Sequence, residues 1–292
     1  MTAPTPTAPA SPDAAGTVDL HTHSTASDGV LAPAAVVEAA HAAGLAAVAL
    51  TDHDSVAGLT EARAAGERLG VRVVAGAELS AYVDREEIHL LALHIDQYGV
   101  IADELARFRD DRVARAERMV EKLRRLGVDV SMDDVLREAG GGAVGRPHVA
   151  RAVVAAGGAA DVREAFDRFL GDGRPANVEK PRLDARDAIG LAHAAGGIAV
   201  WAHPGQAGRR DKVEPLAAAG LDGLEVLHPR HSGEDMSRLS ALAEHFGLVT
   251  SGGSDWHGPV DSWRTLGMMR VPTQVLEAQE VRVWARRRAA DA

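Results

Sequence analysis

Short apolar segments alternate with Ala-rich or amphipathic segments along most of the chain. The apolar segments 45–50 and 198–201 are continuous, as expected for strands buried on both faces of a parallel sheet. Between such segments, residues 31–43 are Ala-rich, and Gly44 stands where a helix C-terminal cap belongs. This alternation predicts an α/β fold built on a parallel sheet or barrel. Further strands are expected at 18–20, 71–77, 88–95, 221–227 and 248–250.

The alternation stops between residues 101 and 180. A long charged amphipathic helix is expected at 101–126, followed by shorter helices at 149–155 and 162–170. Because no convincing strand occurs there, we interpret 101–180 as a helical insertion. The expected organisation is therefore a tail at 1–17, a barrel formed by 18–100 and 181–292, and the insertion at 101–180.

Composition narrows the possible functions. The chain has no cysteine, which excludes disulfides and thiol catalysis, and its net charge of -10 disfavours a broad nucleic-acid-binding face. Aromatic residues make up only 3% of the chain, so the core must consist mostly of Ala, Val and Leu. No apolar segment approaches the length of a membrane span, and the Pro- and Ala-rich start reads as a disordered tail rather than a signal peptide. We expect a cytoplasmic protein with no membrane contact and no stable protein partner.

Residues able to bind metals follow the expected strands again and again. His21 and His23 end the first strand and project from the same side, since side chains alternate along a strand. In parallel α/β folds the carboxyl ends of the strands form the active-site edge. The candidate ligands are His21, His23, Asp28, His53, Glu78, His89, His203, Asp255 and His257. Their nitrogen and oxygen donors suit Zn²⁺, Mn²⁺ or Fe²⁺, and nine ligands require two or three ions, with Glu78 a natural bridge.

Three polar residues close to the candidate ligands in the sequence are not expected to bind a metal directly. Asp52 and Asp54 flank His53, and either could cap the following helix or support the site from behind. His94 falls on the opposite face of its strand from His89, which places it away from the other candidates.

Taken together, these motifs resemble those of the PHP (polymerase and histidinol phosphatase) superfamily. The motifs are His21-Thr22-His23, Thr51-Asp52-His53-Asp54, Glu78, Ile88-His89, Ala202-His203-Pro204 and Gly253-Ser254-Asp255-Trp256-His257. The segment Gly145-Arg146-Pro147-His148 in the insertion narrows the resemblance to the bacterial branch related to 3',5'-nucleotide bisphosphate phosphatases and 5'-to-3' exoribonucleases.

The resemblance implies a distorted (β/α)₇ barrel that holds three divalent metals. The implied ligand groups are His21, His23, Glu78 and Asp255 for the first metal, Glu78, His89 and His203 for the second, and Asp28, His53 and His257 for the third. The implied activity is hydrolysis of a phosphate ester, on a 3',5'-bisphosphonucleoside or a short 5'-phosphorylated RNA, by hydroxide that the metals activate.

Cationic residues are expected to hold the substrate phosphates. Arg146 and His148 precede a helix N-terminus suited to anions, and Lys180 is a further candidate. His228 and His231 follow the strand 221–227 and are candidate catalytic residues. The alternative for Arg146 is an ion pair with a nearby acid.

Four other functions compete with this interpretation. An amidohydrolase commonly bridges its metals with a lysine at a strand end, but Lys122, Lys180 and Lys212 do not follow expected strands. Histidinol-phosphate phosphatase activity is the second, and the insertion with Arg146 and His148 argues against it. A non-catalytic metal-bound PHP accessory module would have lost ligands, whereas all nine are present. A nucleic-acid-binding module has little support from the charge.

Overall fold

The computed structural model describes residues 16–139, 144–179, 182–259 and 263–290. The chain forms two compact units. The first consists of the described residues up to Ala102 together with those from Leu183 onward, and the second of those described between Asp103 and Arg182. Most of the expected N-terminal tail lies outside the described residues.

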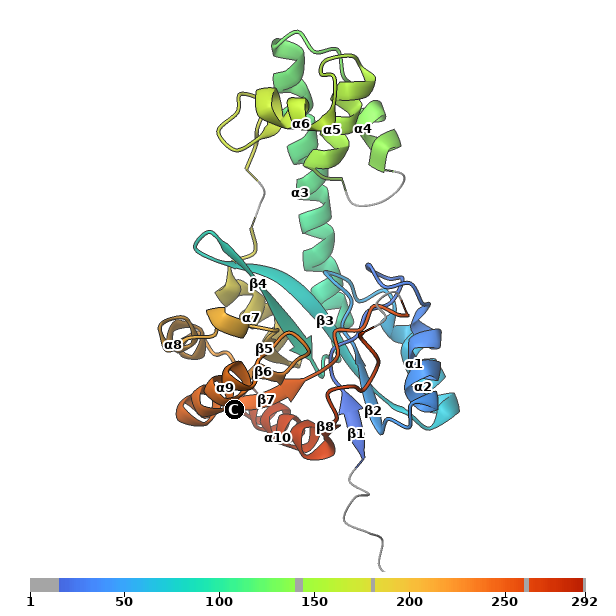
Figure 1. Cartoon of the computed structure of the whole chain (residues 1–292), viewed down its shortest axis with the longest axis vertical. Helices are drawn as coiled ribbons and strands as arrows, with labels where there is room; N and C mark the ends of the chain where they lie inside the picture. Colours follow the sequence, from blue (N-terminus) through green and yellow to red (C-terminus); the bar gives the residue numbers. More distant parts are fainter. Residues whose placement is uncertain (1–15, 140–143, 180–181, 260–262, 291–292) are drawn as a thin grey trace, which may run out of the picture. The chain divides into compact units, whose positions relative to one another are not determined.

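A strongly curved sheet of eight strands forms the first unit (Figure 1), in the order β7-β6-β5-β4-β3-β2-β1-β8. The strands are β1 (Thr17–Asp19), β2 (Ala47–Leu50), β3 (Arg72–Val83), β4 (Glu86–Leu93), β5 (Ile198–Trp201), β6 (Gly223–Leu227), β7 (Val249–Gly252) and β8 (Val271–Pro272). β1, β2 and β3 pair in parallel, as do β5, β6 and β7. The α/β barrel predicted from the sequence is therefore confirmed.

The direction of β4 corrects the expectation of a parallel sheet. β3 continues past Glu78 to Val83, turns at Asp84-Arg85 and returns as β4, so β4 is antiparallel to both β3 and β5. A two-residue connection can join only antiparallel strands, and Asp84 adopts the left-handed conformation (φ 54°) that such turns require. Glu78 consequently lies in mid-strand, close to His89 near the start of β4.

The barrel is closed by the segments that follow β1 and β7. The N–H of Leu20 donates to Gly252 O at 3.1 Å, and the N–H of Asp255 donates to His21 O at 2.9 Å. These bonds bring the expected ligands His21 and Asp255 to adjacent positions although they belong to the two ends of the barrel sequence. Closure and site formation are thus the same structural event.

Helices pack around the strands and complete the core. They are α1 (Pro33–Ala42), α2 (Leu59–Leu69), α7 (Ala185–Ala194), α8 (Arg210–Ala218), α9 (Gly233–Phe246) and α10 (Thr273–Ala290), with a short 3₁₀ turn η3 (Gly205–Ala207). α10 packs against β1, β5, β7 and β8 and adds Leu276 and Val283 to a core of small strand residues. As the low aromatic content predicted, this core is made largely of Ala, Val, Leu and Ile.

The described residues of the second unit contain helices joined by short irregular segments, and no strand. Its helices are α3 (Tyr98–Arg125, which begins in the first unit), α4 (Met132–Ala139), α5 (Arg146–Ala155) and α6 (Val162–Ala165), followed by the π-helix η2 (Phe166–Leu170). It has an apolar core of its own, which includes Met119, Leu123, Val149 and Leu170. Among the described helices, none is long and apolar enough to cross a membrane.

The closure can be tested at Gly253. A Cβ atom at this position would lie 2.5 Å from both the Cβ and the backbone N of His21, closer than any real contact. We expect Gly253→Ala to lower the free energy of unfolding by about 1–3 kcal/mol, the usual range for overpacking. Gly190→Ala is the matched control, because a Cβ there meets nothing within 4 Å. In the middle of α7 it should raise stability by up to about 1 kcal/mol. Denaturant unfolding measures the free energy of unfolding of both variants. Equal values for Gly253→Ala and Gly190→Ala would contradict the destabilisation expected from the tight contact at Gly253.

Candidate metal centre

Glu78 is the point at which the candidate ligands meet. Its side chain is completely buried, and five histidine rings surround its two carboxylate oxygens. The nitrogens lie between 2.8 and 3.3 Å from the nearest oxygen, and they are His21 Nε2, His23 Nε2, His53 Nδ1, His89 Nδ1 and His203 Nε2. Strands β1, β2, β4 and β5, or the segments directly after them, supply these rings.

Ordinary hydrogen bonds do not account for this arrangement. An ionised carboxylate offers about four lone-pair sites, fewer than the five ring nitrogens around Glu78. His23 is buried, yet neither of its ring nitrogens has a hydrogen-bond partner, and Nδ1 of His89 also lacks one. These nitrogens lie near carboxylate oxygens without the alignment of a hydrogen bond. Buried polar atoms left in this way are costly, so the donor set fits divalent cations.

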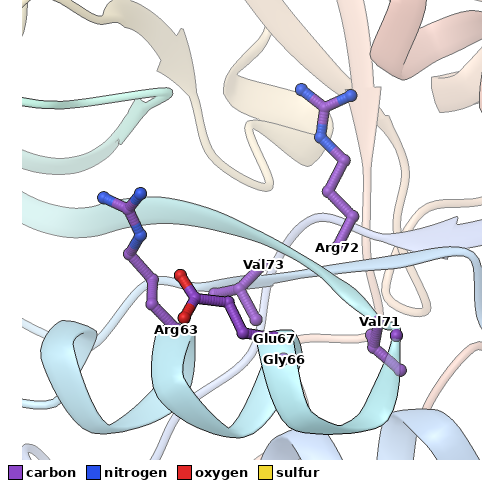
Figure 2. A pocket seen from close by; sticks show the side chains of 7 residues that line it. Arg63, Gly66, Glu67, Val71, Arg72 and Val73 are labelled. Carbon is purple, nitrogen blue, oxygen red and sulfur yellow. The ribbon is translucent and has the colours of Figure 1, made fainter.

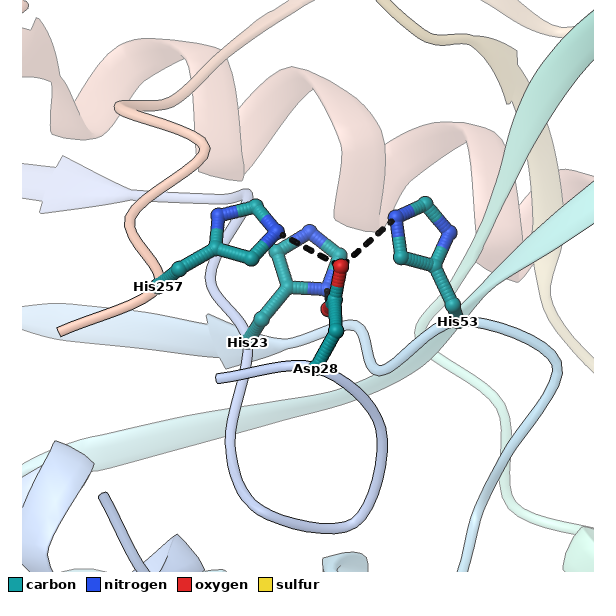
Figure 3. A group of neighbouring side chains, drawn as sticks. All are labelled: His23, Asp28, His53 and His257. Atoms are coloured by element: carbon teal, nitrogen blue, oxygen red, sulfur yellow. Dashed lines mark ion pairs between the residues drawn. The ribbon is translucent and has the colours of Figure 1, made fainter. Parts of the chain in front are cut away.

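Three groups of side chains bring their nitrogen and oxygen atoms within 4.8 Å of one another. The groups are His21, His23, Glu78 and Asp255; His53, Glu78 and His89; and His23, Asp28, His53 and His257. Figure 3 shows the third group, in which Asp28 Oδ2 lies 3.3 Å from His257 Nε2 and 3.9 Å from His53 Nε2. The family resemblance implied Glu78, His89 and His203 for the second metal, and here His53 takes the place of His203. It implied Asp28, His53 and His257 for the third, and here His23 is added to them. All nine expected residues lie in this one cluster.

Charges within the cluster keep Glu78 and Asp255 ionised. Burial opposes ionisation of Glu78, but His21 and the other rings together hold its pKa well below the usual range. Burial also opposes ionisation of Asp255, and the nearby rings of His228, His23 and His21 nevertheless lower its pKa. For His21 burial lowers the pKa, and the attraction of two buried glutamates outweighs it and raises the pKa well above its usual value. The carboxylates are therefore in the state that metal binding requires.

Two acids behind the cluster were missed by sequence reasoning. Asp19 is buried and accepts the N–H groups of Ser254 at 2.9 Å and Gly267 at 2.8 Å. Glu225 is fully buried in β6, with Oε1 3.1 Å from His21 Nδ1. The signal that could have found them is a single acid within an otherwise apolar strand, because a buried charge needs a partner.

The segment carrying Asp255 is held in an unusual backbone conformation. Asp255 (φ 52°) and His203 (φ 32°) both adopt positive φ, which costs a non-glycine residue of the order of 1–3 kcal/mol. Arg264, whose role the sequence did not reveal, is buried beside this segment. Its Nη1 donates to the backbone O of Asp255 and, at 3.1 Å, to Oδ2 of the same residue. Such strain is typical of functional sites whose surroundings over-determine the geometry.

The aspartates around His53 support loops of the site. Asp52 Oδ1 accepts the N–H of Ser24 at 2.7 Å, and Asp54 Oδ1 accepts the N–H of Ser80 at 2.9 Å. The N-cap of α2 is Gly58, without a side-chain capping bond. Of the two roles considered from the sequence, the structure favours support of the site over helix capping.

His228 and His231 differ in how their rings are used. His228 is fully buried, and its Nδ1 accepts the N–H of Arg230 at 3.2 Å, so its ring proton is on Nε2. That Nε2 lies 3.6 Å from Asp255 Oδ2 and has no hydrogen-bond partner. Both ring nitrogens of His231 are hydrogen-bonded to backbone groups. His228 therefore presents a donor to the cluster, whereas the geometry of His231 favours a supporting role.

The residues expected to bind phosphate belong to the second unit. Arg146 Nη1 donates to Asp172 Oδ1 at 2.7 Å and to Leu170 O at 3.4 Å, while His148 Nδ1 accepts the N–H of Gly145 at 2.9 Å. These are the interactions of an ion pair and a helix cap, and the phosphate-binding role stays a prediction. Lys180 lies outside the described residues.

Other polar features lie apart from the cluster. A pocket of about 380 Å³ between α2 and the start of β3 is lined by Arg63 and Arg72 (Figure 2), which pair with Tyr98 and Glu280. None of the nine candidate ligands lines it. His94 follows β4 at the end opposite His89 and bonds to Gln279 at 3.1 Å, which removes it from the site.

Known proteins share both the sequence and the fold. Residues 19–129 match the PHP domain family. The 3',5'-nucleoside bisphosphate phosphatase of Chromobacterium violaceum is 37% identical over 257 residues, which cover 86% of this chain and 90% of that protein. The chain belongs to the PHP family. As the sequence motifs predicted, it is a metal-dependent phosphoesterase of this family.

Two further PHP relatives extend the comparison. The 5'-3' exoribonuclease of Haemophilus influenzae is 36% identical over 85% of this chain and 92% of its own length. A Bifidobacterium adolescentis protein described as a metal-dependent phosphoesterase has a solved structure with a TM-score of 0.67 and 33% identity, covering 92% of this chain and 96% of that one. The similarity thus includes both units of the PHP chain.

Glu78→Gln tests the residue at the centre of the nine clustered candidate ligands. The substitution keeps the size of the side chain but removes the charge shared by the rings and places an amide donor among them. We expect metal content per chain, measured by elemental analysis, to fall together with turnover. Glu67→Gln on the exposed face of α2 is the control and should keep both. A Glu78→Gln protein with three metals and wild-type turnover would remove Glu78 from the proposed ligands.

Proposed function

We propose that the chain hydrolyses a phosphate ester of a 3',5'-bisphosphonucleoside or of a short 5'-phosphorylated RNA, using three divalent ions held by the nine clustered residues. The observation that carries the proposal is the buried Glu78 carboxylate among five imidazoles, together with the unpartnered nitrogens of His23. The activities named for the two enzyme relatives support the substrate class. Mn²⁺, Zn²⁺ and Fe²⁺ all suit a set of histidines and carboxylates.

In this proposal the nine ligands bind the metals, and His228 donates a proton. When bound, adjacent divalent ions lower the pKa of water and stabilise negative charge on the phosphate. The nine ligands fix the place of the phosphate at the carboxyl end of the barrel. Asp28, whose side chain is 56% exposed, marks the side open to solvent. His228 carries a proton on a nitrogen without a partner, which supports a role as donor to the phosphate or leaving oxygen.

Metal removal and a substrate panel test this function. Dialysis against a chelator should abolish hydrolysis, and added Mn²⁺ or Zn²⁺ should restore it, because the site residues offer no covalent nucleophile of the cysteine type. The panel contains a 3',5'-bisphosphonucleoside, a short 5'-phosphorylated RNA and histidinol phosphate, with phosphate or nucleotide release as the readout. Turnover should be confined to the first two. Full activity in metal-free protein, or preference for histidinol phosphate, would contradict the proposal.

Arg146 is proposed to bind the second phosphate of the substrate. Loss of charge-assisted hydrogen bonds costs about 1.5–3 kcal/mol, so Arg146→Ala should lower kcat/KM for the bisphosphate roughly 10- to 100-fold. An aryl phosphate, which has one phosphate only, should be hydrolysed as before. Asp172→Ala is the matched control, since it removes the ion pair of Arg146 but leaves the guanidinium. Equal losses on both substrates would assign Arg146 to folding, and no loss on either would make it a surface ion pair.

A further inference from the structure

We propose that Glu225 is a positioning residue of the metal centre, which selects the ring tautomer of His21 that can bind a metal and anchors the segment of His203. The inference rests on the proposed metal-dependent function, but it concerns a residue outside the nine expected ligands. Glu225 lies in β6, and its side chain is completely buried. It belongs to none of the three ligand groups among the described residues.

Both oxygens of Glu225 are used by residues that carry the site. Oε1 lies 3.1 Å from His21 Nδ1, and Oε2 accepts the backbone N–H of His203 at 2.6 Å. A carboxylic acid gives up its proton more readily than an imidazolium does, so the proton between Oε1 and Nδ1 belongs to the ring and Glu225 is a carboxylate. An ionised carboxylate can only accept hydrogen bonds, and therefore His21 must donate its Nδ1 proton to it.

This bond determines what the other nitrogen of His21 can do. With the proton on Nδ1, the neutral ring carries its lone pair on Nε2. Nε2 faces Glu78 Oε2 at 3.0 Å and Asp255 Oδ1 at 3.6 Å, which are also lone-pair atoms. Such atoms repel at this distance unless a cation or a second ring proton lies between them. In the metal-loaded protein Nε2 is consequently the ligand atom, and Glu225 makes it available.

A second carboxylate–histidine pair next to the same strand shows what a purely structural pair looks like. Asp222 is also buried, directly before β6, with Oδ2 2.8 Å from His193 Nε2. The other nitrogen of His193 lies 3.4 Å from Arg286 Nη1, a hydrogen-bond donor. The Asp222 pair is therefore complete within the protein, because both carboxylate oxygens and the second ring nitrogen meet donors of the chain. The Glu225 pair ends at two carboxylates, so the neutral ring of His21 is complete only with an added cation.

Glu225→Gln would disturb the pair without changing its size. If the amide oxygen accepts the N–H of His203, the amide NH₂ faces His21 Nδ1 and drives the ring proton to Nε2, where it blocks the metal. If the amide is flipped, two donors face each other at the backbone N–H of His203. Neither orientation reproduces the contacts of the carboxylate. We expect metal affinity to fall about 10- to 100-fold, the usual effect of losing the partner of a ligating histidine.

The experiment compares Glu225→Gln with Asp222→Asn in the full chain. Zn²⁺ affinity is measured by chelator competition, and the thermal stability of the metal-free proteins is recorded beside it. Ring ¹⁵N spectra of the zinc-loaded proteins should show His21 with a protonated Nδ1 in wild type, and loss of that signal in Glu225→Gln. Asp222→Asn should keep the wild-type affinity and the His21 signal even where its thermal stability falls.

Each outcome decides a separate point. A wild-type chain that binds no metal overturns the proposed function itself. A wild-type chain that binds metal, with unchanged affinity and His21 signal in Glu225→Gln, overturns only the role of Glu225. Equal affinity losses in the two variants would mean general damage and also overturn it. If Glu225→Gln does not fold, Glu225→Asp takes its place. Its shorter carboxylate should give intermediate affinity, and wild-type affinity would reject the proposal.

Discussion

A fully buried carboxylate, Glu78, is the constraint on which the rest of the barrel depends. Removing such a charge from water costs several kcal/mol, and the cost is offset only by close partners of opposite sign. Five imidazole nitrogens within 3.3 Å approach it from four strands, and those of His23 and His89 are not aligned for hydrogen bonds to it. A site with so many ring nitrogens and carboxylate oxygens close together is most stable when cations are bound between them.

The architecture of the barrel follows from the need to bring those rings to one carboxylate. The β3–β4 hairpin places Glu78 in mid-strand and turns His89 toward it. Barrel closure between the segments after β1 and β7 brings His21 and Asp255 together, and Gly253 permits the close approach of the two backbones. The helical unit has its own apolar core. The fold of the barrel and the assembly of its site are consequently coupled in their energetics.

Behind the ligands lies a set of buried acids that belong to none of the three ligand groups but restrain the segments around them. Asp19, Asp52 and Glu225 each accept backbone N–H groups from a neighbouring segment of the site. These hydrogen bonds are 2.6 to 2.9 Å long and directional, so they hold the ligand-bearing segments in place before a metal binds. They also explain how His203 and Asp255 can keep backbone conformations that are unfavourable by themselves.

The sequence by itself determined the features that depend on local pattern: the alternation of strands and helices, the helical segment after residue 100, and the identity of nine metal-competent residues in strands or in the segments after them. Only the tertiary structure decided the direction of β4, the sharing of His23 between two ligand groups, and the role of Glu225 beside His21. The physical reason is separation along the chain. His21 and Glu225 are 204 positions apart, and their bond exists only because the barrel brings β1 and β6 close enough for one buried ring to reach both glutamates.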